Sequence, residues 1–92
     1  MSKQYRKKPV VIEAMRVGRT TYPDALEWMH DHGAETASGS MMSGDVEILI
    51  PTLEGVMTAR VGDWIIRGVA GEFYPCKAAI FEATYEAVEV AV

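Results

Sequence analysis

The fold is decided by residues 62–76, which read Gly62-Asp63-Trp64-Ile65-Ile66-Arg67-Gly68-Val69-Ala70-Gly71-Glu72-Phe73-Tyr74-Pro75-Cys76. A Gly-Asp tight turn leads into an apolar strand that carries one arginine. A bend with glycine at both ends follows, and then an aromatic pair that leads to the only cysteine. Glycines permit positive φ in such bends, so this composition indicates one closely specified backbone path. The order of turn, strand, bend and strand predicts an antiparallel β-structure.

Two alternating runs precede this stretch and predict a β-hairpin. Residues 45–50 and 56–61 flank the turn sequence Pro51-Thr52-Leu53-Glu54-Gly55. The apolar residues expected on the core face are Val46, Ile48, Ile50, Met57, Ala59 and Val61. Because the turn at 62–63 follows directly, residues 64–67 are expected to return beside 56–61 as the third strand of a meander.

The rest of the chain predicts an α+β domain. Residues 10–17 are expected to form a strand, and residues 22–33 a helix whose left-handed C-terminal cap is Gly33. Residues 34–44 are expected to be a loop, 72–75 a short strand, 76–81 one helical turn and 84–90 a last strand. The predicted fold is a twisted, mainly antiparallel sheet of five or six strands with a central meander, covered by one α-helix. The basic leader, residues 1–9, is expected to be partly disordered, with a single domain over residues 10–92.

The composition bounds the class of protein. A chain of 92 residues makes one domain, and its single cysteine excludes an intramolecular disulfide, which suits a reducing cytoplasm. No apolar run approaches the roughly 20 residues that cross a bilayer. Residues 1–22 hold six basic residues and one acidic, a sum of +5, whereas residues 23–92 hold three basic and twelve acidic, a sum of −9. The body therefore repels nucleic acid, and only the leader offers a nucleic-acid contact.

Known chemical motifs are weak in this chain. His30 and His32 point about 200° apart on a helix, and no metal-binding spacing exists, so no metal site and no cofactor are expected. A nucleophilic Cys76 needs a neighbouring histidine, and a lone cysteine is more often a small buried residue. Asp63 and Glu72 could act as paired carboxylates, but Asp63 in a turn is expected to bond to the local backbone. The bend at 68–71 lacks a phosphate-loop pattern.

The candidate binding residues are Trp64, Arg67, Tyr74 and Lys77. An arginine with aromatic and lysine neighbours can hold a phosphate, a carboxylate or an acidic side chain of a partner. The alternative for Arg67 is an exposed ion pair with Glu72 across the bend. The alternative for Trp64 is a place in the core, because tryptophan is more often buried than exposed.

Three blocks of the chain resemble a family of short uncharacterised proteins encoded by tailed bacteriophages and prophages. The most specific is the 62–77 block, GDWIIRGV-x-GEFYPCK, which continues into Ile80-Phe81-Glu82-Ala83-Thr84-Tyr85-Glu86. The opening residues 6–14 and the turn residues 52–55 are also similar. The chain departs from the family pattern at Ala70, where lysine is expected, and at Ala78-Ala79, where Pro-Asp is expected. The resemblance implies a phage origin and a place in the cytoplasm of the infected host, and it transfers no functional residue.

These observations lead to one preferred function and three alternatives. The preferred one is a small, non-enzymatic phage accessory protein that binds a host protein or associates with itself. The first alternative is a small-molecule binder, such as a protein that sequesters a nucleotide signal. A Cys76-dependent enzyme and a nucleic-acid binder that uses the leader are the remaining two.

Overall fold

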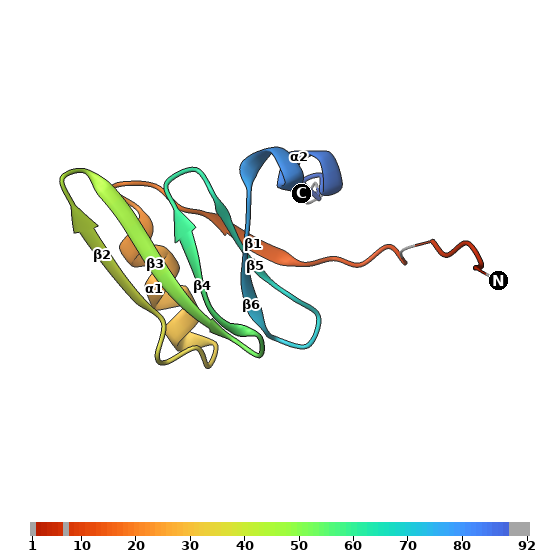
Figure 1. Ribbon diagram of the computed structural model, residues 1–92, viewed down its shortest axis with the longest axis horizontal. Helices are drawn as coiled ribbons and strands as arrows, with labels where there is room; N and C mark the ends of the chain where they lie inside the picture. Colours follow the sequence, from red (N-terminus) through yellow and green to blue (C-terminus); the bar gives the residue numbers. More distant parts are fainter. Residues whose placement is uncertain (1, 7, 89–92) are drawn as a thin grey trace, which may run out of the picture.

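In the computed structural model of this protein, residues 2–6 and 8–88 are described, and they form two three-stranded antiparallel sheets and two helices (Figure 1). The first sheet has the strand order β1-β5-β6, and the second has the order β2-β3-β4. The α+β class is confirmed, but the prediction of a single sheet of five or six strands under one helix is wrong. The elements are β1 (Glu13–Arg16), α1 (Tyr22–Asp31), β2 (Ser38–Met42), β3 (Asp45–Thr52), β4 (Gly55–Arg60), β5 (Trp64–Arg67), β6 (Phe73–Cys76) and α2 (Ala78–Thr84).

Strands β3 and β4 form the hairpin that the sequence predicts. Their pairing ends with Thr52 opposite Gly55, and the Thr52 hydroxyl donates to the Gly55 carbonyl at 2.6 Å. Gly55 has φ +114°, a value that side-chain-bearing residues rarely adopt. The predicted alternation is confirmed in β3, since Ile48 and Ile50 are buried while Leu49 between them is 41% exposed. On the returning strand only Ala59 is buried, and the expected burial of Met57 and Val61 is wrong, because they are 40% and 44% exposed.

The segment predicted to be a loop, residues 34–44, contains strand β2. It pairs antiparallel with β3 along the whole run from Ser38 opposite Leu49 to Met42 opposite Asp45. Every residue of β2 is exposed, so its sequence carries no apolar alternation by which a strand could be recognised. Ser43 and Gly44, both with positive φ, make the turn into β3.

Strand β5 does not continue the meander, which is the main correction to the predicted topology. It pairs with β1 instead, from Glu13 opposite Arg67 to Arg16 opposite Trp64. Beyond the strand ends, the Val17 amide donates to the Asp63 carbonyl at 2.8 Å, which extends the pairing towards the turn. The turn at 62–63 therefore carries the chain from one sheet to the other.

Strand β5 lies in the first sheet because two of its neighbouring residues are both apolar and buried. Ile65 is 0% exposed and Ile66 is 1% exposed, and successive strand residues point to opposite faces. A strand with this pattern needs other elements packed against both faces of its sheet. Ile65 belongs to the core formed with α1 and the second sheet, whereas Ile66 lies on the other face with Tyr74 opposite it.

Strand β1 is shorter than the predicted strand over residues 10–17. Its partner β5 ends at Arg67, opposite Glu13, so residues 10–12 have no strand beside them. Residues 8–12 lie beside residues 84–88, and residues 2–6 extend away from the body of the molecule (Figure 1). Residues 2–6 and 8–12, the described part of the leader and the three residues after it, form no helix or strand.

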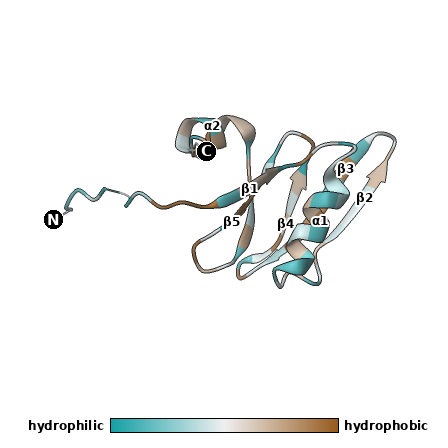
Figure 2. Ribbon diagram, turned by 180° about the vertical axis from the view of Figure 1, so that it is seen from behind, coloured by the Kyte–Doolittle hydropathy of each residue, from teal (hydrophilic) through white to brown (hydrophobic). Residues whose placement is uncertain are grey.

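Helix α1 agrees with the prediction and covers one face of the second sheet (Figure 2). Ala25 and Met29 are its buried residues, and Pro23 lies in its first turn, where its missing N–H costs no hydrogen bond. Gly33 has φ +99° after the helix, and the Ala34 amide donates to the Met29 carbonyl at 2.9 Å. The expected left-handed C-terminal cap is thus confirmed.

Helix α2 is longer than the single helical turn expected over 76–81, and it replaces the start of the predicted last strand. Thr84 ends the helix, and its hydroxyl donates to the Ile80 carbonyl at 2.7 Å. Residues 85–88 form no strand, and residues 89 and 90 of that prediction lie outside the described residues, as do residues 1 and 7 of the leader. The helix is positioned by Phe81, whose ring stacks on Trp64 at a centroid distance of 4.1 Å.

Candidate functional site

The four residues that the sequence singles out do not converge on one site. Opposite residues of paired strands share a face, and Arg67 lies opposite Phe73, whereas Trp64 lies opposite Cys76. Tyr74, opposite Ile66, shares the face of Trp64. Arg67 and Trp64 therefore point to opposite faces of the first sheet, and Lys77 lies beyond the end of β6.

Arg67 is held by an acidic residue of the neighbouring strand. Its Nη1 donates to Glu13 Oε1 at 3.0 Å, so the expected pairing with Glu72 across the bend is wrong. Glu72 instead folds over Gly68, where an added Cβ would collide with its carboxylate. The Gly68 amide donates to the Glu72 carbonyl at 2.7 Å and closes the bend, in which Gly71 adopts the expected positive φ of +86°.

Lys77 neutralises a buried carboxylate. Its Nζ lies 3.2 Å from Asp63 Oδ2, and Asp63 is only 6% exposed. The Arg60 amide donates to the same oxygen at 2.9 Å, which confirms the expected bond from the Asp63 side chain to the local backbone. The charge of Lys77 therefore serves the turn between the two sheets, since a buried carboxylate without partners is costly.

Trp64 and Tyr74 contact the C-terminal part of the chain. Trp64 stacks on Phe81 with an interplanar angle of 9°, and its buried Nε1 has no hydrogen-bond partner among the described residues. Burial is the main cause that raises the pKa of Tyr74 to about 12, and a hydrogen bond with Tyr85 and the nearby charge of Glu72 add to it. Tyr74 is thus a neutral hydrogen-bonding group in the physiological range.

Cys76 and the two histidines bond to backbone carbonyls. Cys76 Sγ donates to the Lys77 carbonyl at 3.6 Å, and His30 Nε2 donates to the Ala37 carbonyl at 2.7 Å. His32 Nδ1 donates to the Trp28 carbonyl at 2.8 Å. Over the described ranges, no group of three metal-ligating side chains occurs. These residues hold the ends of α1 and β6 in place.

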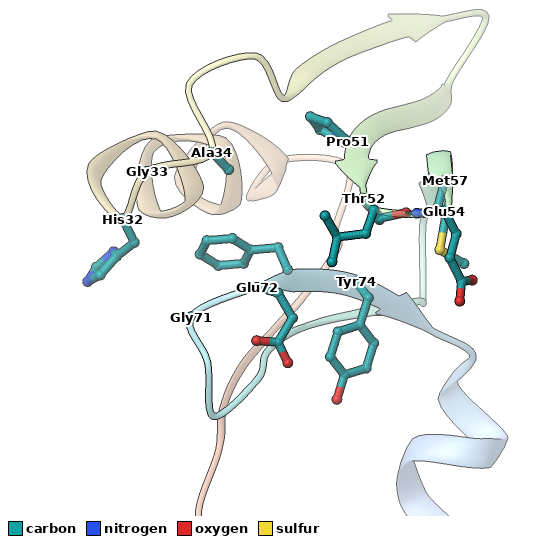
Figure 3. A pocket seen from close by; sticks show the side chains of 12 residues that line it. His32, Gly33, Ala34, Pro51, Thr52, Glu54, Met57, Gly71, Glu72 and Tyr74 are labelled. Carbon is teal, nitrogen blue, oxygen red and sulfur yellow. Dashed lines mark hydrogen bonds between the residues drawn. The ribbon is translucent and has the colours of Figure 1, made fainter.

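A groove of about 740 Å³, which no sequence pattern predicts, lies where three elements meet. It is lined by residues 32–34 at the end of α1, by residues 51–54 and Met57 of the β3–β4 hairpin, and by residues 71–74 of the bend and β6 (Figure 3). Pro51 and Ala34 lie on one side of it in this view, and Glu72 and Tyr74 on the other. We call this feature the hairpin groove.

The hairpin groove is mainly apolar and carries negative charge. Leu53 at the tip of the hairpin is fully exposed, and Met57 is 40% exposed although it lies opposite the buried Ile50 on the inner face of the sheet. Two glutamates, Glu54 and Glu72, lie along the lining, whereas none of the lining residues is a lysine or an arginine. Such a surface favours an apolar ligand with positive charge and disfavours an anion.

Sequence reasoning placed Met57 in the core and Leu53 in an ordinary turn. Met57 does lie on the predicted face, but β4 is an edge strand, so β6 and the hairpin tip leave it open to solvent. The one available signal was Leu53, an apolar residue in a turn that otherwise contains Pro51, Thr52, Glu54 and Gly55. A turn residue of this kind is more often polar.

Comparison of the chain with family models, with curated proteins and with solved structures finds no significant match in any of the three. No helix in the described part of the chain has the length and apolar character needed to cross a membrane.

Proposed function

We propose that this protein is a small, non-enzymatic phage accessory protein that binds an apolar, positively charged segment of a host protein in the hairpin groove. Its place of action would be the cytoplasm of the infected bacterium. The phage origin rests on the resemblance of the 62–77 block, whereas the binding role rests on the groove. A module of this size and charge can act by occupying a surface of a larger protein.

The observation that supports binding is the combination of exposed apolar side chains with a concave surface. Leu53 and Met57 are exposed in the same hollow, beside Phe73 and Pro51. Exposed apolar groups that line a recess mark interaction sites in soluble proteins, because burying them releases free energy that scattered surface residues do not provide. Glu54 and Glu72 then select a partner that carries lysine or arginine.

The nucleotide-binding alternative receives less support from the geometry. It requires free cations beside an aromatic surface, and the cations suggested for it were Arg67 and Lys77. Arg67 pairs with Glu13 and Lys77 pairs with Asp63, while the hairpin groove carries two glutamates. A nucleotide phosphate would have to displace one of these pairs.

Selection of random peptides on the immobilised protein tests the proposed function. We expect enrichment of peptides with an apolar centre flanked by lysine or arginine. Met57→Asp should weaken their binding at least about tenfold, the usual effect of a central interface residue. Leu49→Asp is the matched control, because Leu49 is 41% exposed, like Met57, but points to the outer face of the sheet. Equal weakening by both variants, or enrichment of acidic peptides, would contradict the proposal.

A further inference from the structure

The leader is taken here together with the three residues that follow it, as residues 2–12, and the composition of this exposed segment complements the hairpin groove. Between residues 2 and 12 it carries Lys3, Arg6, Lys7 and Lys8 and no acidic residue. It also exposes apolar side chains, with Tyr5 at 90% exposure and Val10 and Val11 further along. A basic segment with an exposed aromatic side chain is suited to bind an apolar surface that carries carboxylates.

The hairpin groove supplies those features in the same chain. Leu53 and Met57 offer apolar contacts for the Tyr5 ring, and Glu54 offers a carboxylate for Arg6 or Lys8. The charge is complementary on a larger scale as well, because residues 23–92 sum to −9 and residues 1–22 to +5. The leader therefore has a better electrostatic match on the body than on another leader.

The position of the leader indicates that the groove it binds belongs to a second copy of the chain. In this structure residues 2–6 extend away from their own body (Figure 1), whereas residues 8–12 lie beside residues 84–88. Residues 2–12 span at most about 36 Å when fully extended. This length exceeds the shortest dimension of the molecule, 25 Å, so the leader of one copy can lie across another copy.

We propose that the leader of one copy, residues 2–12, binds in the hairpin groove of a second copy. This proposal rests on the proposed function, since it uses the same groove and names its occupant. Each copy has one leader and one groove, so reciprocal exchange closes after two copies and gives a symmetric dimer. A host segment that binds the groove must then displace the leader, which makes self-association and partner binding compete.

A photo-crosslinking amino acid at position 5 tests this exchange in the full chain. Equal amounts of ¹⁴N- and ¹⁵N-labelled protein are mixed, irradiated and digested. We expect crosslinks to residues 51–57 or 71–74 that join peptides of different isotope label. Met57→Asp should reduce their yield at least about tenfold, whereas Leu49→Asp should leave it unchanged. Raised salt should reduce it as well, because exposed ion pairs are screened.

Crosslinks within one label only would mean that the leader folds back on its own groove, and they would overturn the exchange. Crosslinks to other parts of the body, or a yield no higher than that of the same amino acid at Met42, which is 77% exposed, would also overturn it. The proposed function fails separately, if Met57→Asp leaves peptide binding unchanged while the leader crosslinks persist.

Discussion

The β5–β6 region and the hairpin groove differ in what their side chains already contact. In the first region, Trp64 stacks on Phe81, Arg67 pairs with Glu13, and Lys77 pairs with Asp63. In the hairpin groove, Leu53 and Met57 remain exposed. The distinctive residues of the sequence thus stabilise the fold, while a plain turn sequence forms the surface that we propose binds a partner. Substitutions in the two regions should separate stability from binding.

The largest loss of stability is expected in the middle of β5. Ile65→Ala and Ile66→Ala should each lower the free energy of unfolding by about 2–4 kcal/mol, because both side chains are buried, on opposite faces of the strand. Denaturant unfolding measures this. If Ile66→Ala cost no more than a surface substitution, β5 would be covered on one face only, and the distinction between the two regions would weaken.

A smaller loss is expected at the turn between the sheets. Asp63→Ala leaves the Arg60 amide without its side-chain acceptor and should cost about 1–3 kcal/mol. Lys77→Ala should cost less than about 1 kcal/mol, because the Lys77 side chain is largely exposed. Peptide binding by the folded variants should be unchanged. If Lys77→Ala lost peptide binding at normal stability, Lys77 would be part of the binding surface after all.

Tyr74 gives the next effect, which appears only at alkaline pH. Its pKa is raised in the folded state to about 12 from an ordinary value of 10.0. The neutral phenol is therefore favoured by folding, so its contribution is complete below pH 10 and is lost as the pH rises towards 12. Unfolding curves across this range should show a fall in stability that Tyr74→Phe reduces. An identical fall in Tyr74→Phe would mean that another group is responsible.

The smallest change in stability is expected at the hairpin tip. Leu53→Asp should alter the free energy of unfolding by less than about 0.5 kcal/mol, because the side chain is fully exposed. The same variant should weaken peptide binding at least about tenfold. Thermal unfolding and binding titration on one preparation measure both. A destabilised Leu53→Asp with normal binding would reverse the roles of the two regions.

Local patterns allowed part of the fold to be predicted. The hairpin follows from the alternation around Pro51 and Gly55, and α1 from its apolar face and the Gly33 cap. The pairing partner of β5 could not be predicted from local patterns. Ile65 and Ile66 indicate burial on both faces of the strand, but they do not indicate which strand lies beside it. Strand β2 escaped prediction because all of its side chains are exposed.

The hairpin groove was beyond sequence reasoning for a related reason. It is formed by three segments that are far apart in the chain, and apart from the apolar Leu53 in a turn none of them has an unusual sequence. The partners of Arg67 and Lys77 were likewise decided by strand order, which brings Glu13 and Asp63 beside them. The pairing of strands that are distant in sequence therefore determines which charged residues form ion pairs within the fold.

The assignment of the hairpin groove as the binding surface is tested most directly by photo-crosslinking in bacteria that produce the protein. One variant carries the photo-crosslinking amino acid at Leu53, and another carries it at Lys77. We expect the variant at position 53 to form a covalent adduct with another polypeptide, and the variant at position 77 to form little or none. Adducts at position 77 with none at position 53 would contradict the assignment of the hairpin groove as the binding surface.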